Sequence, residues 1–521
     1  MSVVYLIGAG PGDPGLITVR GQQCLAGADV VIYDRLVHGR LLRHARADAE
    51  RIDVGQAAPK PLELEAICYL LAEKAREGRT VARLKWGDPF VFDSGGPEAL
   101  FLHEQRVRFE VVPGIPAGVG IPAYAGVPIT YPGGGDTLTF VRGHENEGHT
   151  RAAIDWTGLA KLDGTIVCYA GPEQAHGLLS ALLAHGRPED EPAALIYQGS
   201  QPTQETIDGT LAELARRTKD TVDRRAAILV VGRVAALRQH LRWFDVRPLF
   251  GKRVLVTRAR DQAAGFVQAI EAAGGEAIEA PMIRILPPDE YGPLDEACAR
   301  AGSFEWIVFA SRNAVDAFLE RLLASPQDVR ALAGVRLCAV GAATAARLAE
   351  RGLKADLVPP EYRAESIAQA LGSVQGRRIL LPRADIGREA LADDLRRGGA
   401  QVVEVVAYRT GVAEPGREDE PDIYQMLLDG RIDVVTFTSP SAVRNFARVV
   451  GAEPAADLLR PTVVAAIGPV TADAAAQFGI TAAIVPAQHT VPALVDAIVG
   501  YFETRRPAAA RPARHHTAGS P

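Results

Sequence analysis

The sequence predicts an α/β protein built from two or three domains. At 521 residues the chain is longer than a single hydrophobic core usually supports. Short β-branched runs alternate with amphipathic stretches through both halves, which is typical of α/β folds. The second half also contains an internal repeat, so we expect two related lobes there.

The alternation defines the elements of the first half. We expect strands near residues 3–7, 29–33, 79–84, 107–112, 164–169 and 226–231, and helices near 16–27, 62–77 and 173–185. The pattern breaks at residues 243–251, and a fresh strand begins at 252–258. We therefore predict one domain over 1–245, a second over 251–502, and a disordered Ala/Pro/Arg-rich tail over 505–521.

The repeat in the second half is collinear. Residues 253–259 recur as 378–384, residues 308–318 as 436–446, and residues 339–359 as 466–486. The offsets stay between 125 and 128 residues, so both order and spacing are kept. Two similar α/β lobes follow, and the crevice between them is the natural ligand site.

Composition and charge argue against several classes of function. The net charge is −6, and the basic residues are spread among the acidic ones rather than gathered in runs, so we expect no nucleic-acid binding. No apolar run approaches the roughly 20 residues that span a bilayer, and the N-terminus lacks the features of a secretory signal. We expect a cytoplasmic protein with no membrane contact. The spacing of the five cysteines and of the histidines predicts core cysteines and no metal site.

The first strand is followed by a glycine-rich loop, residues 8–15. It is similar to the dinucleotide-binding fingerprint, but Asp13 stands where the third glycine belongs, and two prolines remove N–H groups that would bind a pyrophosphate. Glycines that let the backbone approach a ligand, next to a carboxylate, suit a ligand without phosphate. S-adenosylmethionine, which is cationic at sulfur, is such a ligand.

Five segments of the first half follow the order and spacing of the tetrapyrrole methyltransferase family. They read GAGPGD at 8–13, VIYDRLV at 31–37, RLKWGDPFVF at 83–92, VVPGI at 111–115 and AGVPIT at 125–130. Residues 1–245 therefore resemble this family, and the YDRLV form resembles its uroporphyrinogen-III C-methyltransferases. The resemblance implies a two-subdomain methyltransferase fold and a homodimer joined through this half.

The resemblance also implies roles for individual residues. Asp34 would be the general base, because methylating a pyrrole carbon requires a proton to leave; the alternative is that Asp34 caps the turn after its strand. Arg83 would bind substrate. The residues expected at the methyl donor, S-adenosylmethionine, are Gly10, Pro11, Gly12, Asp13, Trp86, Gly87, Asp88, Val91, Pro116, Ala117, Tyr169, Ala170 and Gly199.

Three departures from the family pattern bear on the methyltransferase chemistry. Gln56 replaces a lysine sometimes assigned as a proton donor, with Lys60 the nearest substitute. Trp86 replaces a glycine and adds bulk beside the expected donor. Ser94 replaces an arginine that could hold a substrate carboxylate. An alternative reading is therefore that this half is a binding or scaffold module.

The second half resembles uroporphyrinogen-III synthase over residues 251–502. The segments that carry the resemblance read KRVLVTR at 252–258, LPRADIGRE at 381–389, AYRT at 407–410, TFTS at 436–439 and IGPVTA at 467–472. The resemblance implies a two-lobed α/β fold in which the chain crosses twice between lobes. The first lobe would combine residues 251–284 with 410–502, and the second would hold residues 285–409.

The synthase resemblance implies that Tyr408 and Thr471 would help hydroxide leave hydroxymethylbilane or hold the substrate. Thr471 could instead simply cap a helix. Ser311 and Ser439 are expected at the substrate. Because the substrate carries eight carboxylates, we also expect it to bind arginines that follow strands: Arg258, Arg260, Arg312, Arg363, Arg383 and Arg388.

The two resemblances together predict a bifunctional enzyme. It would cyclise hydroxymethylbilane to uroporphyrinogen III, then methylate that product with S-adenosylmethionine to precorrin-2. The alternatives are a chain in which only the synthase half is active, and a tetrapyrrole-sensing module without enzymatic activity. Whether the product enters cobalamin or sirohaem synthesis stays open.

Overall fold

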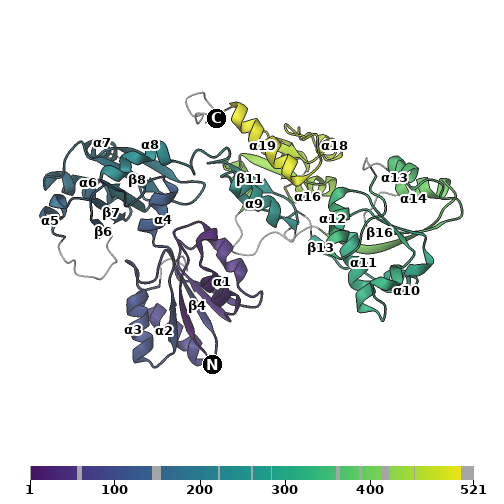
Figure 1. The fold of residues 1–521 in the computed structure, drawn as a ribbon, viewed down its shortest axis with the longest axis horizontal. Helices are drawn as coiled ribbons and strands as arrows, with labels where there is room; N and C mark the ends of the chain where they lie inside the picture. The colour runs from purple at the N-terminus through teal and green to yellow at the C-terminus, as the bar shows by residue number, and fades with distance from the viewer. Residues whose placement is uncertain are drawn as a thin grey trace, which may run out of the picture.

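The computed structural model places the chain in four β-sheets with helices packed against them (Figure 1). It describes residues 2–55, 62–143, 154–220, 223–259, 262–282, 284–359, 364–385, 390–411, 422–450 and 452–505. Two of the sheets lie in the first half of the chain and two in the second. The predicted α/β class is confirmed.

The first sheet is parallel throughout, with the strand order β3-β2-β4-β1-β5. Its strands are β1 (Val4–Gly8), β2 (Val30–Tyr33), β3 (Glu50–Asp53), β4 (Val81–Lys85) and β5 (Phe109–Val112). Helix α1 (Val19–Ala26) and the 3-10 helix η2 (Gly39–His44) pack on one face, and α2 (Leu64–Arg76) and α3 (Gly95–Glu104) on the other. Because parallel strands end at one edge, the loops that carry the sequence motifs meet there.

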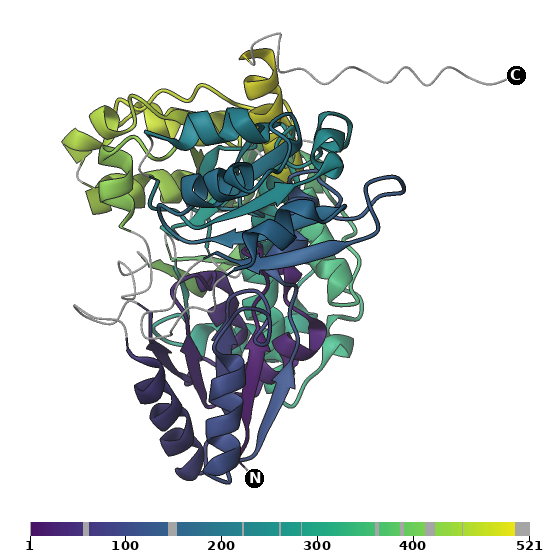
Figure 2. The same cartoon turned by 90° about the vertical axis from the view of Figure 1, so that its left-hand side faces the viewer.

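The second sheet is mixed, with the order β6-β7-β10-β8-β9. Its strands are β6 (Leu138–Arg142), β7 (Thr165–Ala170), β8 (Pro192–Tyr197), β9 (Glu205–Thr210) and β10 (Ala227–Val231). Helices α5 (Trp156–Lys161), α6 (Ala175–Ala184) and α7 (Leu211–Thr218) cover one face. Helix α4 (Ala117–Tyr124) covers the other and follows directly from the first sheet, which lies below the second in Figure 2.

Aromatic side chains anchor the segment that leaves the second sheet. After η3 (Arg233–Leu237) and α8 (Arg238–Leu241), the rings of Trp243 and Phe244 lie with their centroids 5.1 and 4.8 Å from that of Tyr124. Phe244 in turn contacts Phe250, with centroids 5.5 Å apart, just before the third sheet begins. The connection is therefore packed against α4 rather than loosely tethered.

The third sheet is parallel and draws its strands from two distant parts of the chain. Its order is β12-β11-β18-β19, formed by β11 (Arg253–Val256), β12 (Glu276–Glu279), β18 (Val434–Phe437) and β19 (Val463–Ala466). The helices of this lobe are α9 (Ala264–Ala272), α15 (Ile423–Leu428), α16 (Pro440–Val450), α17 (Ala452–Leu458), α18 (Pro469–Ala476) and α19 (Val491–Arg505).

Ion pairs join this lobe to the first sheet's side of the molecule. Arg40 pairs with Glu271 of α9, and its Nη2 also donates to the carbonyl of Ala277 at 3.0 Å. Arg43 pairs with Glu279 of β12, whose side chain is only 8% exposed. Both arginines come from η2, so one short element of the first half forms ion pairs with the lobe built on the third sheet.

The fourth sheet has the order β13-β17-β16-β14-β15. Its strands are β13 (Arg284–Leu286), β14 (Trp306–Phe309), β15 (Arg336–Ala339), β16 (Arg378–Ala384) and β17 (Gln401–Gly411), with only β13 antiparallel to its neighbour. Its helices are α10 (Gly292–Ala299), α11 (Arg312–Ala324), α12 (Ala342–Glu350), α13 (Ala364–Leu371) and α14 (Ala390–Arg397). The chain passes between the third and fourth sheets twice, after β12 and after β17.

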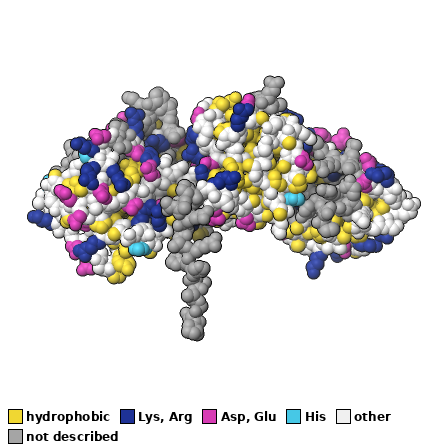
Figure 3. Space-filling view, turned by 90° about the horizontal axis from the view of Figure 1, so that it is seen from above, with side chains coloured by type: hydrophobic (Ala, Val, Ile, Leu, Met, Phe, Trp, Pro, Cys, Tyr) yellow, Lys and Arg dark blue, Asp and Glu magenta, His cyan; other side chains and the backbone are white. Residues whose placement is uncertain are grey.

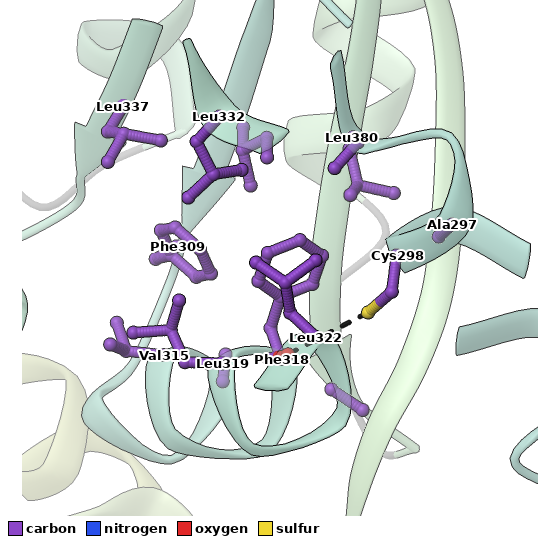
Figure 4. Packing of buried hydrophobic residues seen from close by; sticks show 14 of the residues in the cluster. Ala297, Cys298, Phe309, Val315, Phe318, Leu319, Leu322, Leu332, Leu337 and Leu380 are labelled. Atoms are coloured by element: carbon purple, nitrogen blue, oxygen red, sulfur yellow. Dashed lines mark hydrogen bonds between the residues drawn. The ribbon is translucent and has the colours of Figure 1, made fainter. Parts of the chain in front are cut away.

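The core of this lobe is built from large apolar side chains between α10, α11 and the sheet (Figure 4). Phe309 and Phe318 meet edge to face with centroids 5.7 Å apart, and the Cys298 thiol donates to the Phe318 carbonyl. All five cysteines are buried and unbridged, and burial raises the pKa of Cys298 to about 12. The prediction of core cysteines is confirmed.

The repeat corresponds to matching elements in the two lobes. The succession β14, α11, β15, α12 in one lobe parallels β18, α16, β19, α18 in the other. Ser311 and Ser439 occupy the same place: each hydroxyl accepts a hydrogen bond from the backbone three residues on, at 3.1 and 3.2 Å. Thr344 and Thr471 also correspond, and both are buried in the first turn of their helices.

Basic and acidic side chains are interspersed on the face drawn in Figure 3. Among the described residues, no helix has both the length and the apolar character needed to cross a bilayer.

We predict that residues 1–245 and 250–505 fold when expressed separately. In the described ranges no strand of the first two sheets pairs with a strand of the last two, so each half closes its own hydrogen-bond ladders. Each fragment should therefore show a cooperative thermal transition by circular dichroism. If neither fragment folds while the intact chain does, the boundary near Pro248 is misplaced.

Candidate functional site

Two loops at the carboxyl edge of the first sheet are bonded to each other. Gly10, after β1, and Gly87, after β4, exchange two backbone hydrogen bonds of 3.2 and 2.8 Å. Both have positive φ, at 80° and 71°, which favours glycine. A Cβ on the neighbouring Gly114 would stand 2.2 Å from the Gly87 carbonyl oxygen, so the loops after β1, β4 and β5 approach too closely for a side chain.

Two carboxylates in these loops, those of Asp13 and Asp88, accept hydrogen bonds from backbone N–H groups. Asp88 accepts hydrogen bonds from the N–H of Phe90 at 2.8 Å and of Gly114 at 3.0 Å. Asp13 accepts from the N–H of Gly15 and from the Tyr124 hydroxyl, both at 2.7 Å. Burial, followed by the bond to Asp13, raises the pKa of Tyr124, which keeps this phenol a donor.

Trp86 is part of this loop assembly. Its indole N–H donates to the carbonyl of Pro11 at 2.9 Å, which ties the loop after β4 to the loop after β1. The ring packs, together with Val91 and Phe92, against the cluster that contains α4. The bulk that distinguishes this residue from the family's glycine is therefore used to join two loops.

The second sheet supplies the facing wall. Pro116 and Ala117 begin α4, and the Tyr169 hydroxyl accepts a hydrogen bond from the N–H of Gly118 at 2.8 Å. Ala170 is buried at the end of β7. On the next loop Gly199 faces Ile121 of α4, and Ser200 accepts a 3.1 Å bond from the N–H of Asp13. The residues expected at the methyl donor therefore lie in the loops at the carboxyl edge of the first sheet, at the start of α4, at the end of β7 and in the loop after β8.

Asp34 lies beside this junction, directly after β2. Its Oδ1 accepts a hydrogen bond from Arg83 Nη2 at 2.5 Å, and its Oδ2 lies 3.8 Å from Lys85 Nζ. The side chain is 28% exposed, whereas those of Arg83 and Lys85 are 1% and 0% exposed. The carboxylate of Asp34 is thus partly exposed, while the two cations that contact it, Arg83 and Lys85, are buried.

Arg83 differs from the expectation that it binds substrate. Besides Asp34, its guanidinium donates to Glu98 from Nε and Nη2, both at 3.2 Å, and it has almost no accessible surface. Burial opposes its charge, but Glu98 and Asp34 outweigh that effect and raise the pKa of Arg83. The guanidinium of Arg83 is therefore buried beneath Asp34, and the partly exposed carboxylate lies above it.

Lys85, Asp93 and Glu98, the other charged members of this cluster, were not predicted from the sequence. Lys85 Nζ donates to Ser94 Oγ at 2.7 Å and to Glu98 Oε1 at 2.9 Å, and lies 3.0 Å from Asp93 Oδ1. Glu98, on α3, is fully buried. The available signal was the pair of charged residues at alternate positions in β4, which puts both on one face of a buried strand. Gln56 and Lys60 fall outside the described residues.

In the second half, polar contacts link the two lobes. Arg258, which follows β11, donates to Gln262 Oε1 at 3.3 Å, and Gln262 donates to Asn313 of α11. Within the second lobe, Tyr408 of β17 shares a 3.0 Å hydrogen bond with the hydroxyl of Ser311. Burial raises the pKa of Tyr408, although Ser311 and Asn313 oppose the shift, so the phenol keeps its proton.

Other expected synthase residues have further partners of their own. Arg383 lies 3.0 Å from Glu404 of the adjacent strand, so that carboxylate already faces its charge. Thr471 is 3% exposed in α18, whose cap is Gly468 rather than Thr471. Ser439 bonds Ser441 at 3.0 Å, and Arg312 lies 3.9 Å from Glu350. Arg260, Arg363 and Arg388 lie outside the described residues.

Family models match both halves. The model described as Tetrapyrrole (Corrin/Porphyrin) Methylases covers residues 3–215, and that described as Uroporphyrinogen-III synthase HemD covers residues 264–496. The porphyrin biosynthesis protein HemD of Ruminiclostridium josui is 33% identical over 499 residues, which span 95% of this chain and 97% of that protein.

Two further relatives resemble the first half alone. The S-adenosyl-L-methionine-dependent uroporphyrinogen III methyltransferase of Methanosarcina barkeri is 40% identical over 235 residues, covering 45% of this chain and 92% of that protein. The solved uroporphyrin III C-methyl transferase of Thermus thermophilus is 35% identical, covers 45% of this chain and 100% of its own, and superposes with a TM-score of 0.40. The chain belongs to the tetrapyrrole methylase family in its first half and to the uroporphyrinogen-III synthase family in its second.

Proposed function

We propose that this chain converts hydroxymethylbilane to uroporphyrinogen III in its second half and methylates that product to precorrin-2 in its first. The observation that supports the proposal is the set of contacts among Gly10, Gly87, Pro11 and Trp86 at the junction of the first two sheets, beside the partly exposed carboxylate of Asp34. The full-length similarity to a porphyrin biosynthesis protein supports the pairing of the two activities.

The residues at the junction suit S-adenosylmethionine. Asp13 and Asp88 are the only charged side chains in the expected set, so the site is negative and matches a sulfonium cation. When bound, S-adenosylmethionine supplies an electrophilic methyl group. The glycine loops after β1, β4 and β5 approach one another closely at this site. Asp34, whose carboxylate is partly exposed beside them, would take a proton from the substrate.

The synthase half needs few chemical groups. Its substrate stabilises the cation formed when hydroxide leaves, so the protein mainly folds the linear tetrapyrrole and prevents closure without inversion of the last ring. Tyr408, a protonated phenol held by Ser311, is a donor that can assist hydroxide departure. Arg258, beside the Gln262–Asn313 contact between lobes, is placed to meet a substrate carboxylate.

A product analysis tests the proposal. Purified full-length protein is incubated with hydroxymethylbilane, with and without S-adenosylmethionine, and the products are identified by mass and by isomer. We expect uroporphyrinogen III without the donor and a doubly methylated product with it. Uroporphyrinogen III alone in both reactions would reduce the first half to a binding module; uroporphyrinogen I would remove the synthase assignment.

We further propose that the protein acts in the cytoplasm as a homodimer assembled through its methyltransferase half. Light scattering on fragments 1–245 and 250–505 tests the assembly, since only the first fragment should show twice its chain mass.

We predict that single hydroxyl removals in the synthase half are mild. Tyr408→Phe and Thr471→Ala should each lower turnover of hydroxymethylbilane by about 10- to 100-fold, at or below the low end of what a positioned proton donor supplies. Thr344→Ala is the matched control, because Thr344 occupies the equivalent buried position in the other lobe. Equal losses in the Thr471 and Thr344 variants would assign Thr471 to packing, and complete loss in Tyr408→Phe would make Tyr408 the main acid.

A further inference from the structure

The buried cluster under the methyltransferase site holds more carboxylates than cations. Arg83 and Lys85 supply two positive charges, and Asp34, Asp93 and Glu98 supply three carboxylates. Taking an unbalanced charge out of water is costly, so such a cluster favours the uptake of one proton.

The three carboxylates differ in what they can reach. Glu98 is fully buried and accepts from both cations, so it balances charge inside the protein. Asp34 and Asp93 keep 28% and 20% of their side chains exposed. Only these two can exchange a proton with a ligand at the surface.

Lys85 connects the two accessible carboxylates. Its ammonium lies 3.0 Å from Asp93 Oδ1 and 3.8 Å from Asp34 Oδ2 and has no exposed surface of its own. Ser94, which stands where the family has an arginine, contacts both Lys85 and Asp93. Its hydroxyl accepts a hydrogen bond from Lys85 at 2.7 Å, and its N–H donates to Asp93 at 2.6 Å. The segment 93–94 therefore brings a second carboxylate to the site in place of a cation.

We propose that Asp93 is a second proton-accepting carboxylate of the methyltransferase, coupled to Asp34 through Lys85. This inference rests on the proposed function and deepens it. Burial, opposed by Lys85 and assisted by the charge of Asp34, raises the pKa of Asp93, whereas Asp34 is tied to Arg83. When two neighbouring carboxylates differ in environment in this way, one can hold a proton while the other stays ionised and accepts one.

The step balances without a further reagent. A pyrrole carbon attacks the methyl carbon of the donor; the new C–C bond forms as the C–S bond breaks, and its electron pair stays on sulfur. The macrocycle, now cationic, loses a proton from carbon to the carboxylate pair, and the C–H electron pair restores its neutral conjugated system. The proton held by the pair then passes to solvent before the next transfer.

The test compares Asp93→Asn with the parent in full-length protein supplied with uroporphyrinogen III and S-adenosylmethionine. We expect methyl transfer to slow by about 10- to 100-fold, less than a full general-base loss because Asp34 remains, while donor affinity stays the same. A proton acceptor must be ionised, so the parent rate should fall at low pH through the raised pKa. In Asp93→Asn that acid limb should move to lower pH. Asp48→Asn, at an exposed carboxylate paired with Arg46, is the control.

A double-variant cycle adds a readout that a packing role would not move. If Asp34 and Asp93 act as a unit, Asp34→Asn should cost less in the Asp93→Asn background than in the parent. An unchanged rate, or a slower rate with an unshifted acid limb and additive losses, overturns the role of Asp93. A parent that never methylates uroporphyrinogen III overturns the proposed function itself, and this inference with it.

Discussion

Replacing Asp34 by alanine is expected to lower methyl transfer to uroporphyrinogen III by about 10²- to 10⁴-fold, the range that a positioned general base contributes. The carboxylate is partly exposed at the edge of the first sheet and is oriented by Arg83 at 2.5 Å. Donor binding should hardly change, because the loops that would hold S-adenosylmethionine are closed by bonds of Gly10, Gly87 and Trp86 that do not involve Asp34.

Calorimetric titration of the donor and single-turnover methyl transfer separate these two effects. Asp34→Asn, which keeps the size of the side chain, should behave like Asp34→Ala. Turnover at the parent level in both variants would assign Asp34 to the turn that follows β2, where its carbonyl accepts a bond from the N–H of Val37.

Replacing Glu98 by glutamine should destabilise the first domain by about 1–3 kcal/mol, because the buried hydrogen bonds from two cations lose their charged acceptor while the cluster as a whole becomes balanced in charge. Glu98 accepts from Lys85 at 2.9 Å and from Arg83 at 3.2 Å, and all three side chains are inaccessible. Without its charge, two buried cations would face only the more exposed Asp34 and Asp93.

Hydrogen exchange measured by mass spectrometry is suited to this prediction, because a chain of several domains does not unfold in one step. Peptides of β4 should lose protection in Glu98→Gln, while peptides of the fourth sheet should not. Glu104→Gln, an exposed position on the same helix, serves as the control. Unchanged protection in β4 would mean that the charge of Glu98 is dispensable for the fold.

Elements with strong apolar periodicity could be predicted from the sequence, and edge elements could not. The ranges expected around 3–7, 29–33 and 79–84 match β1, β2 and β4 closely because these strands are buried. Strands β3 and β9 carry polar residues and are at most partly buried at sheet edges, so no hydrophobic pattern marks them. Strand β8 is buried, but proline and alanine at its start are poor strand formers.

Some residues of the candidate site could likewise be predicted from the sequence, and others could not. Residues in contiguous glycine-rich loops were found because the backbone geometry is encoded locally, as at Gly10 and Gly87. The partners Lys85, Asp93 and Glu98 come from a strand, a loop and a helix, and only folding reveals that their charges meet. Arg83 was expected at the substrate, but the sequence does not show that its side chain is buried and donates to Asp34.

The ion pairs of Arg40 with Glu271 and of Arg43 with Glu279 affect how the two lobes of the synthase half are attached to the rest of the chain. These ion pairs attach the lobe built on the third sheet to the methyltransferase half. The lobe built on the fourth sheet is joined to it by the two crossings after β12 and β17. Any change in the angle between the two lobes would therefore also change the angle between the fourth sheet and the methyltransferase half, while the third sheet keeps its contacts with η2.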